Sequence, residues 1–95
     1  MSPEQRRSRF RRDYRRLTPR QQKRFRAAAR LLDEGLKRGL VDPRLRFKRV
    51  QGHRDVWELS FDRDGRATMR YERLPGGELL IEWRRVGGHD IFAAP

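Results

Sequence analysis

Apolar residues recur with helical spacing in the first part of the chain. Phe10, Tyr14 and Leu17 fall at positions i, i+4 and i+7, and a second series with the same period follows them. The members of that second series are Phe25, Ala28, Ala29, Leu32 and Leu36. Gly39 offers a stop directly after it. The pattern predicts two helices that form a hairpin over residues 3–38.

Both predicted helices begin with the same local signal. The segments SPEQ at residues 2–5 and TPRQ at residues 18–21 each place a hydroxyl residue at the cap, proline at the first helical position and glutamine three residues after the cap. This order is typical of a capping box, in which the two side chains satisfy free backbone N–H groups at the helix start. We therefore expect a helix to begin after residue 2 and another after residue 18.

After Pro43 the apolar residues alternate with polar ones, which is the period of a β-strand. The alternation predicts strands at residues 45–50, 56–61, 66–72 and 79–85. Short segments rich in turn-forming residues separate the last three strands: DRDG at 62–65 and LPGG at 74–77. Strands joined by short turns form an antiparallel meander, here over residues 45–86. The predicted class is α+β, with the helical hairpin packed on one face of a four-stranded sheet.

Alternation also assigns each strand residue to one of two faces. The apolar face, which we expect to meet the helices, comprises Leu45, Phe47, Trp57, Leu59, Phe61, Ala67, Met69, Tyr71, Leu79, Ile81 and Trp83. The opposite face comprises Arg46, Lys48, Glu58, Ser60, Arg66, Thr68, Arg70, Glu82 and Arg84. We call this second set the polar platform. It is predicted to be exposed and mostly cationic.

The segment WRRVGGHDIF at residues 83–92 runs from the last predicted strand into the C-terminal tail, residues 87–95. Its two glycines permit a sharp bend. In a meander, the turn at residues 62–65 lies at the same end of the sheet as the exit of the last strand. We therefore expect His89 to lie over the polar platform beside Arg66.

Composition narrows the possible partners. A chain of 95 residues suits one domain, here residues 1–95, and its net charge is +12. Residues 1–30 hold 12 of the 25 basic residues and two of the 13 acidic ones, so the remaining 65 residues carry 13 basic against 11 acidic residues. A field of this sign attracts polyanions, nucleic acid above all. A solvated, charged helix face is the simpler alternative.

Several classes of site have no support in the sequence. The chain has no cysteine and only two histidines, which excludes disulfides and thiolate chemistry and argues against a zinc site, so no metal or cofactor is expected. There is no long apolar run and no signal-peptide pattern. We therefore expect a cytoplasmic protein without a membrane partner.

The predicted helical hairpin is followed, in order, by the segments LRFKRVQG, VWELSFDRDGRATMRY and WRRVGGHDIF. These four features in this order resemble the RelE/ParE superfamily of bacterial toxin–antitoxin toxins, and its actinobacterial members in particular. The resemblance covers roughly residues 8–92. It implies a RelE-like fold and either of two activities. The RelE side of the superfamily cuts messenger RNA on the ribosome, and the ParE side poisons DNA gyrase.

The resemblance also implies roles for particular residues. Lys48 matches a basic residue at the cleavage site, and Arg66 matches an arginine that contacts the scissile phosphate. His89 falls where several RelE-like nucleases carry a catalytic histidine or arginine. Phe92 falls where the family has an aromatic residue that stacks on a base. One departure is clear: the family begins with a short apolar strand, whereas this chain begins with the capping signal in MSPEQRR.

The residue types fit RNA cleavage by the attack of a 2′-hydroxyl on the adjacent phosphorus. Such a reaction needs a base, an acid and cations for the phosphate. His89 suits proton transfer because the imidazole side chain, as a residue type, changes charge near neutral pH, and Glu58 is a candidate base. Arg66 and Lys48 would hold the phosphate. Further RNA contacts are expected at Arg46, Arg70, Arg84 and Phe92.

Each assignment has a structural alternative. Arg46, Arg70 and Glu82 equally suit cross-strand ion pairs. Phe92 equally suits a packing role that holds the tail.

The leading hypothesis is a toxin that acts as a metal-independent endoribonuclease on messenger RNA at the ribosome. Its basic helices would dock on ribosomal RNA, and an acidic antitoxin would inhibit it. The main rival is a noncatalytic module of the same fold that binds nucleic acid or protein, including a ParE-like gyrase inhibitor.

Overall fold

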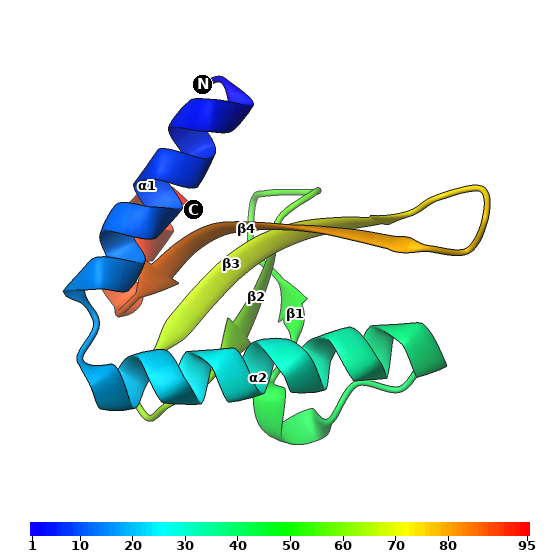
Figure 1. Ribbon diagram of the computed structural model, residues 1–95, viewed down its shortest axis with the longest axis horizontal. Coiled ribbons are helices and arrows are strands. Elements are labelled where there is room, and N and C mark those ends of the chain that lie inside the picture. The colour runs from blue at the N-terminus through cyan, green and yellow to red at the C-terminus, as the bar shows by residue number, and fades with distance from the viewer.

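A computed structural model describes residues 1–95 and consists of two helices followed by one antiparallel sheet (Figure 1). The elements in chain order are α1 (Pro3–Arg16), α2 (Pro19–Arg38), η1 (Pro43–Leu45), β1 (Lys48–Arg49), β2 (Trp57–Ser60), β3 (Arg66–Arg73), β4 (Leu79–Gly87) and η2 (His89–Ala93), where η marks a 3₁₀ helix. The four strands pair in sequence order. The predicted α+β class, with helices first and a meander second, is confirmed. Neither helix is both long and apolar enough to cross a membrane.

Both predicted capping boxes are present. The Ser2 hydroxyl accepts a hydrogen bond from the Gln5 backbone N–H at 3.2 Å, and the Gln5 side chain accepts one from the Ser2 N–H at 2.7 Å. Thr18 and Gln21 repeat the arrangement at the start of α2. Gly39 ends α2 with φ of 77°, a left-handed conformation that glycine adopts without strain. Local sequence therefore determines both ends of α2 and the start of α1.

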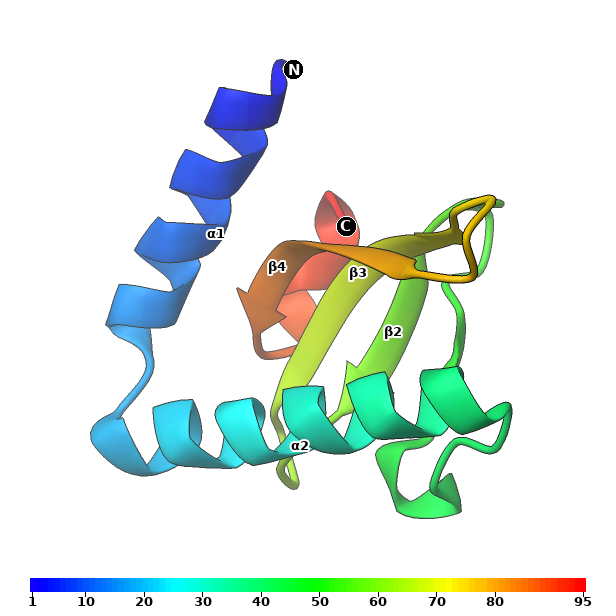
Figure 2. The ribbon, with the colours of Figure 1, turned by 45° about the vertical axis from the view of Figure 1, so that its right-hand side comes forward.

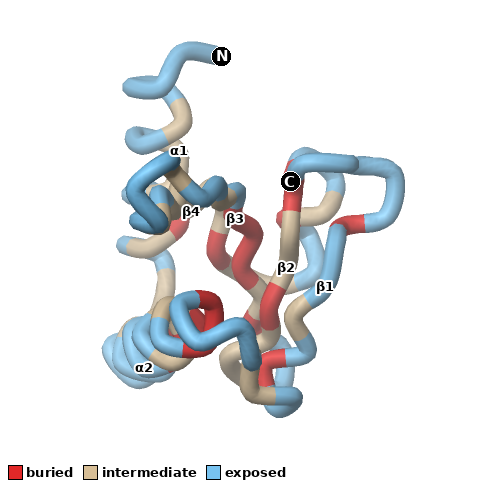
Figure 3. Tube along the Cα trace, turned by 90° about the vertical axis from the view of Figure 1, so that its right-hand side faces the viewer, coloured by how far each residue is buried: buried red, intermediate tan, exposed pale blue.

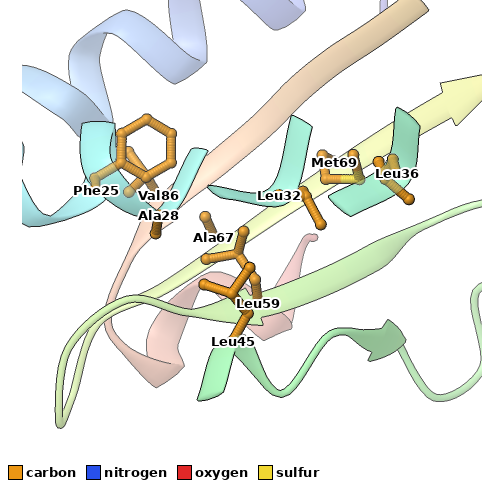
Figure 4. Packing of buried hydrophobic residues seen from close by; sticks show 9 residues of the cluster. All are labelled: Phe25, Ala28, Leu32, Leu36, Leu45, Leu59, Ala67, Met69 and Val86. Carbon is orange, nitrogen blue, oxygen red and sulfur yellow. The ribbon is translucent and has the colours of Figure 1, made fainter. Parts of the chain in front are cut away.

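The two helices meet at residues 17–18 and diverge steeply, so each contacts a different part of the sheet (Figures 1 and 2). α2 lies across one face of the sheet, and its residues Phe25, Ala28, Leu32 and Leu36 are buried there. They form one hydrophobic cluster with Leu45, Leu59, Ala67, Met69 and Val86 (Figure 4). Figure 3 shows the buried segments gathered between α2 and the strands. α1 instead packs beside β4, where the Phe10 ring centroid lies 6.5 Å from that of Trp83.

The strand predicted at residues 45–50 is mostly not a strand. Pro43–Leu45 forms a 3₁₀ turn, Arg46 has a left-handed backbone with φ of 50°, and only Lys48–Arg49 pairs with β2. The Asp42 side chain caps the turn by accepting the Arg44 backbone N–H at 2.9 Å, and proline fixes the first φ of the turn. The cap and the proline override the alternating pattern, so the prediction that Arg46 lies on the polar platform is wrong.

A β-bulge changes the face pattern near the end of β4. Thr68 lies opposite Arg85 while the next residue, Met69, lies opposite Trp83, so Arg84 is the extra residue. Val86 consequently belongs to the cluster under α2, and the partly buried Trp83 packs against the same cluster. Bulges increase local twist and re-aim side chains, and this one turns the end of β4 toward α1 and the tail.

The tail covers part of the face that alternation predicts to be exposed. It lies on the side of the sheet away from α2 (Figures 2 and 3), and Ile91 in η2 is 1% exposed. Thr68, assigned to the polar platform, is fully buried, with no hydrogen-bond partner for its hydroxyl. Arg84 Nε donates to the Pro95 carbonyl at 3.0 Å, which holds the end of the tail. The prediction of an open platform is therefore wrong around Thr68.

Candidate nucleic-acid interface

The exit of β4 lies beside the β2–β3 turn. Arg66 pairs with Ser60 on one side and with Gly87 on the other. Gly87 precedes His89 by two residues, so the tail begins where β3 begins, as the meander geometry predicts. His89 is exposed, and its ring centroid lies 5.9 Å from that of Phe92. The imidazole has no hydrogen bond to another protein group.

The Arg66 guanidinium is fixed by the turn that precedes it. Its Nη1 donates to the carbonyl oxygens of Asp62 at 3.2 Å, Arg63 at 3.2 Å and Gly65 at 2.9 Å. Its Nε and Nη2 donate to no protein group. Three bonds to backbone carbonyls remove most of the rotamer freedom of a long side chain, so two charged donors are held in place and remain available to an anion.

Lys48 and Glu58 lie directly opposite each other on β1 and β2. Glu58 in turn lies opposite Thr68, which is two residues from Arg66 along β3. Diagonal neighbours of this kind are roughly 7–8 Å apart in antiparallel sheets. Three of the four predicted catalytic residues thus share one face and neighbouring rows. No hydrogen bond or ion pair joins any two of Lys48, Glu58, Arg66 and His89.

The residues predicted to contact RNA are in different environments. Arg70 is exposed and lies opposite Glu82. Arg84 is 19% exposed, bonds to the tail and lies 3.9 Å from Glu82. Burial is the main cause that lowers the pKa of Arg84. Phe92 is half-buried beside His89. Arg84 therefore has a structural contact, whereas the Arg70 guanidinium has no bound partner.

A buried ion pair that the sequence analysis does not predict joins α1 to β4. Arg85 Nε donates to Asp13 Oδ2 at 2.7 Å and Arg85 Nη2 to Oδ1 at 3.2 Å. The Val86 backbone N–H also donates to Asp13 Oδ2 at 3.2 Å. Asp13 is 7% exposed, and hydrogen bonding to its carboxylate raises the pKa of Arg85. The sequence held one signal that could have indicated this pair: Asp13 is one of only two acids in residues 1–30, which hold 12 basic residues.

A second cationic site lies at the end of the sheet where η1, α2 and the β2–β3 turn meet. It is a cleft of about 650 Å³, which we call the arginine cleft. Its lining residues are Arg24, Ala27, Ala28, Leu31, Arg44, Leu45, Arg46, Ser60, Phe61, Asp62, Arg63 and Arg66. Five of these twelve are arginines and one is an acid. Sequence reasoning missed Arg24, Arg44 and Arg63 because they come from three separate elements that only the fold brings together.

No group of three or more His, Asp or Glu side chains is placed to hold a metal ion. In comparisons with known proteins, no family model, no curated protein and no solved structure matches the chain. The resemblance to the RelE/ParE superfamily consequently stays a prediction from the residues themselves.

Proposed function

We propose that the protein is the toxin of a toxin–antitoxin system and cleaves messenger RNA at the ribosome, as RelE-type toxins do. The observation that carries the proposal is the strand register that pairs Arg66 with Gly87, two residues before His89. This register sets the start of the tail beside the strand that carries Arg66, whose guanidinium is anchored to the preceding turn. The order of the sequence segments and the net charge of +12 support the same function.

The proposed chemistry uses the RNA's own 2′-hydroxyl as the nucleophile. Glu58 takes the proton from this hydroxyl as the oxygen attacks the adjacent phosphorus. His89, in its protonated form, donates a proton to the departing 5′ oxygen. The products are a 2′,3′-cyclic phosphate and a free 5′-hydroxyl, and no metal takes part in these steps.

Arg66 and Lys48 supply the positive charge in this scheme. The phosphorus gains negative charge as the fifth bond forms, and cations already in position stabilise that charge without reorganising. Arg66 Nη1 is bonded to the turn, so Nε and Nη2 form the edge that faces the phosphate. Lys48 is exposed on the two-residue strand β1 and contributes a more mobile charge.

The proposed partners follow from charge. The outer surface of α1 carries exposed arginines without a carboxylate partner, namely Arg7, Arg11, Arg12, Arg15 and Arg16. Such a surface suits the phosphates of ribosomal RNA. An acidic antitoxin segment would compete for the same charges and so inhibit the toxin.

The test is cleavage of a messenger RNA by the purified protein with and without ribosomes, with the cut sites mapped by primer extension. We expect cuts only with ribosomes, and a rate lower by about 10²- to 10⁴-fold in His89→Ala, the usual contribution of general acid–base catalysis. His53→Ala is the matched control, because His53 is the only other histidine and lies in the exposed β1–β2 loop. Arg66→Lys keeps the charge but removes the paired donors, so it should lose part of the rate. An intact message in the presence of ribosomes would overturn the nuclease.

A noncatalytic nucleic-acid or protein binder of the same fold, including a gyrase inhibitor, is the second candidate. The observation in its favour is that no bond orients His89 and no hydrogen bond links the four proposed catalytic side chains. Growth arrest that persists in His89→Ala, with undamaged message and broken DNA, would favour gyrase. Arrest that is lost in both His89→Ala and Arg66→Ala, with folding intact, would favour the nuclease.

A further inference from the structure

The arginine cleft holds more positive charge than the acids in and beside it neutralise. Arg24 donates to Asp62 at 3.0 Å, and Arg44 pairs with Asp42 at 2.8 Å. Hydrogen bonds from Arg44 lower the pKa of Asp42 to about 2, so this carboxylate stays ionised over the physiological range. The guanidinium groups of the other cleft arginines, Arg46, Arg63 and Arg66, form no ion pair with a carboxylate. The side chains of Arg46 and Arg63 form no hydrogen bond at all within the protein.

Arg46 has an unusual backbone for its residue type. It is the only non-glycine residue with positive φ, at 50°, and it ends the 3₁₀ turn η1. A left-handed conformation is unfavourable for an ordinary L-residue, and such strained residues concentrate at ligand-binding positions. Asparagine or glycine would satisfy the same turn with less strain. An arginine with this strained backbone ends the turn instead, and its unpaired guanidinium lies at the edge of the cleft.

Part of the cleft lining is apolar. It includes Leu45, which is 4% exposed, and the half-buried Leu31 and Phe61. The volume of the cleft, about 650 Å³, falls within the range of roughly 300–1,000 Å³ that is common for ligand sites. A lining of guanidinium groups and apolar side chains matches a nucleotide, because the phosphates bind the arginines while the sugar and base cover apolar surface.

Arg66 belongs both to this cleft and to the proposed reaction site. We propose that the arginine cleft binds backbone phosphates of the single-stranded RNA segment next to the cleavage point, with Arg46 and Arg63 as its main contacts. This inference rests on the proposed function in taking RNA as the ligand. The cleft has no role in proton transfer, since its only acid is bonded to Arg24.

The test measures binding of a short single-stranded RNA of mixed sequence at several salt concentrations, by fluorescence anisotropy. All proteins carry His89→Ala, so the RNA stays intact. The probe variant combines Arg46→Asn, which tolerates the left-handed backbone, with Arg63→Ala. The matched control is Arg54→Ala, which removes an exposed arginine of the β1–β2 loop outside the cleft. Circular dichroism checks that each protein is folded.

Loss of two phosphate contacts should make the plot of log K against log salt less steep by about 1.4, or about 0.7 for each contact with single-stranded RNA. The control should keep the slope of its parent. Equal slopes for the probe variant and its parent would overturn the proposal, as would an equal change in Arg54→Ala. If the wild type cuts no message but the slope still falls only in the probe variant, the nuclease fails and the cleft stands.

Discussion

Arg85 and Arg63 are the same residue type, but one is partly buried and ion-paired and the other is exposed and unpaired. The Arg85 side chain is 18% exposed and forms two hydrogen bonds to a buried carboxylate, whereas Arg63 is exposed at the edge of the arginine cleft without an acceptor for its side chain. Arginine is thus a structural residue in one region and an unpaired charge in the other. In so cationic a chain, binding sites are indicated by the arginines that the protein leaves unpaired.

The first region joins elements that are far apart in sequence. Asp13 lies on α1, and its carboxylate accepts bonds from both Arg85 and the Val86 backbone N–H on the outer edge of β4. An edge strand exposes N–H groups that need a partner, and this carboxylate satisfies one of them. The contact therefore attaches α1 to the sheet, while α2 is attached by its apolar face.

The largest expected effect follows from breaking the first region. Asp13→Ala should reduce the free energy of unfolding by about 3 kcal/mol, because two donors of a partly buried guanidinium and one backbone N–H lose their acceptor. Asp13→Asn should cost less, since its amide oxygen can still accept one bond. Urea denaturation followed by circular dichroism measures both. A loss below about 1 kcal/mol in Asp13→Ala would mean that water replaces the carboxylate and that the pair is not structural.

Local signals explain which parts of the fold were predictable. The caps at Ser2 and Thr18 and the stop at Gly39 act within a few residues, and the helices begin and end where these signals predict. The alternating pattern at residues 45–50 predicted a strand wrongly because the Asp42 cap competes with pairing. The burial of Thr68 was not predictable either, since alternation does not reveal that the tail returns over that face.

The residues of the candidate site likewise fall into those that local sequence predicted and those that it did not. Lys48, Glu58 and Arg66 were placed on one face from strand period alone, and the register bears this out. The arginine cleft required contacts between Arg24 on α2 and Asp62 in a turn 38 positions later. Side chains that meet through such long-range packing leave no periodic signal in the sequence.

Arg9 combines features of the two regions, because it is partly buried like Arg85 but has an unpaired donor like Arg63. Arg9 has a buried Nε without a hydrogen-bond partner. Burial, followed by the charges of Arg85 and Arg84, lowers the pKa of Arg9, and Asp13 opposes them. Replacing such an uncompensated group by an apolar residue of similar length removes its desolvation cost. Arg9→Met should therefore increase the free energy of unfolding by about 1 kcal/mol in urea denaturation, and a loss of stability would show that the Arg9 charge is satisfied by solvent.

The smallest effect on stability is expected in the second region. Arg63→Ala removes an exposed side chain that bonds to nothing in the protein, so the free energy of unfolding should change by no more than about 0.5 kcal/mol. Its backbone carbonyl, which accepts from Arg66, is unaffected by the substitution. The same variant should nevertheless weaken RNA binding. Arg63→Ala should therefore change the anisotropy signal but not the thermal denaturation, whereas Arg9→Met should raise the stability measured by denaturation. If Arg63→Ala destabilised the fold by more than 1 kcal/mol, this guanidinium would have a structural partner, and the contrast with Arg85 would disappear.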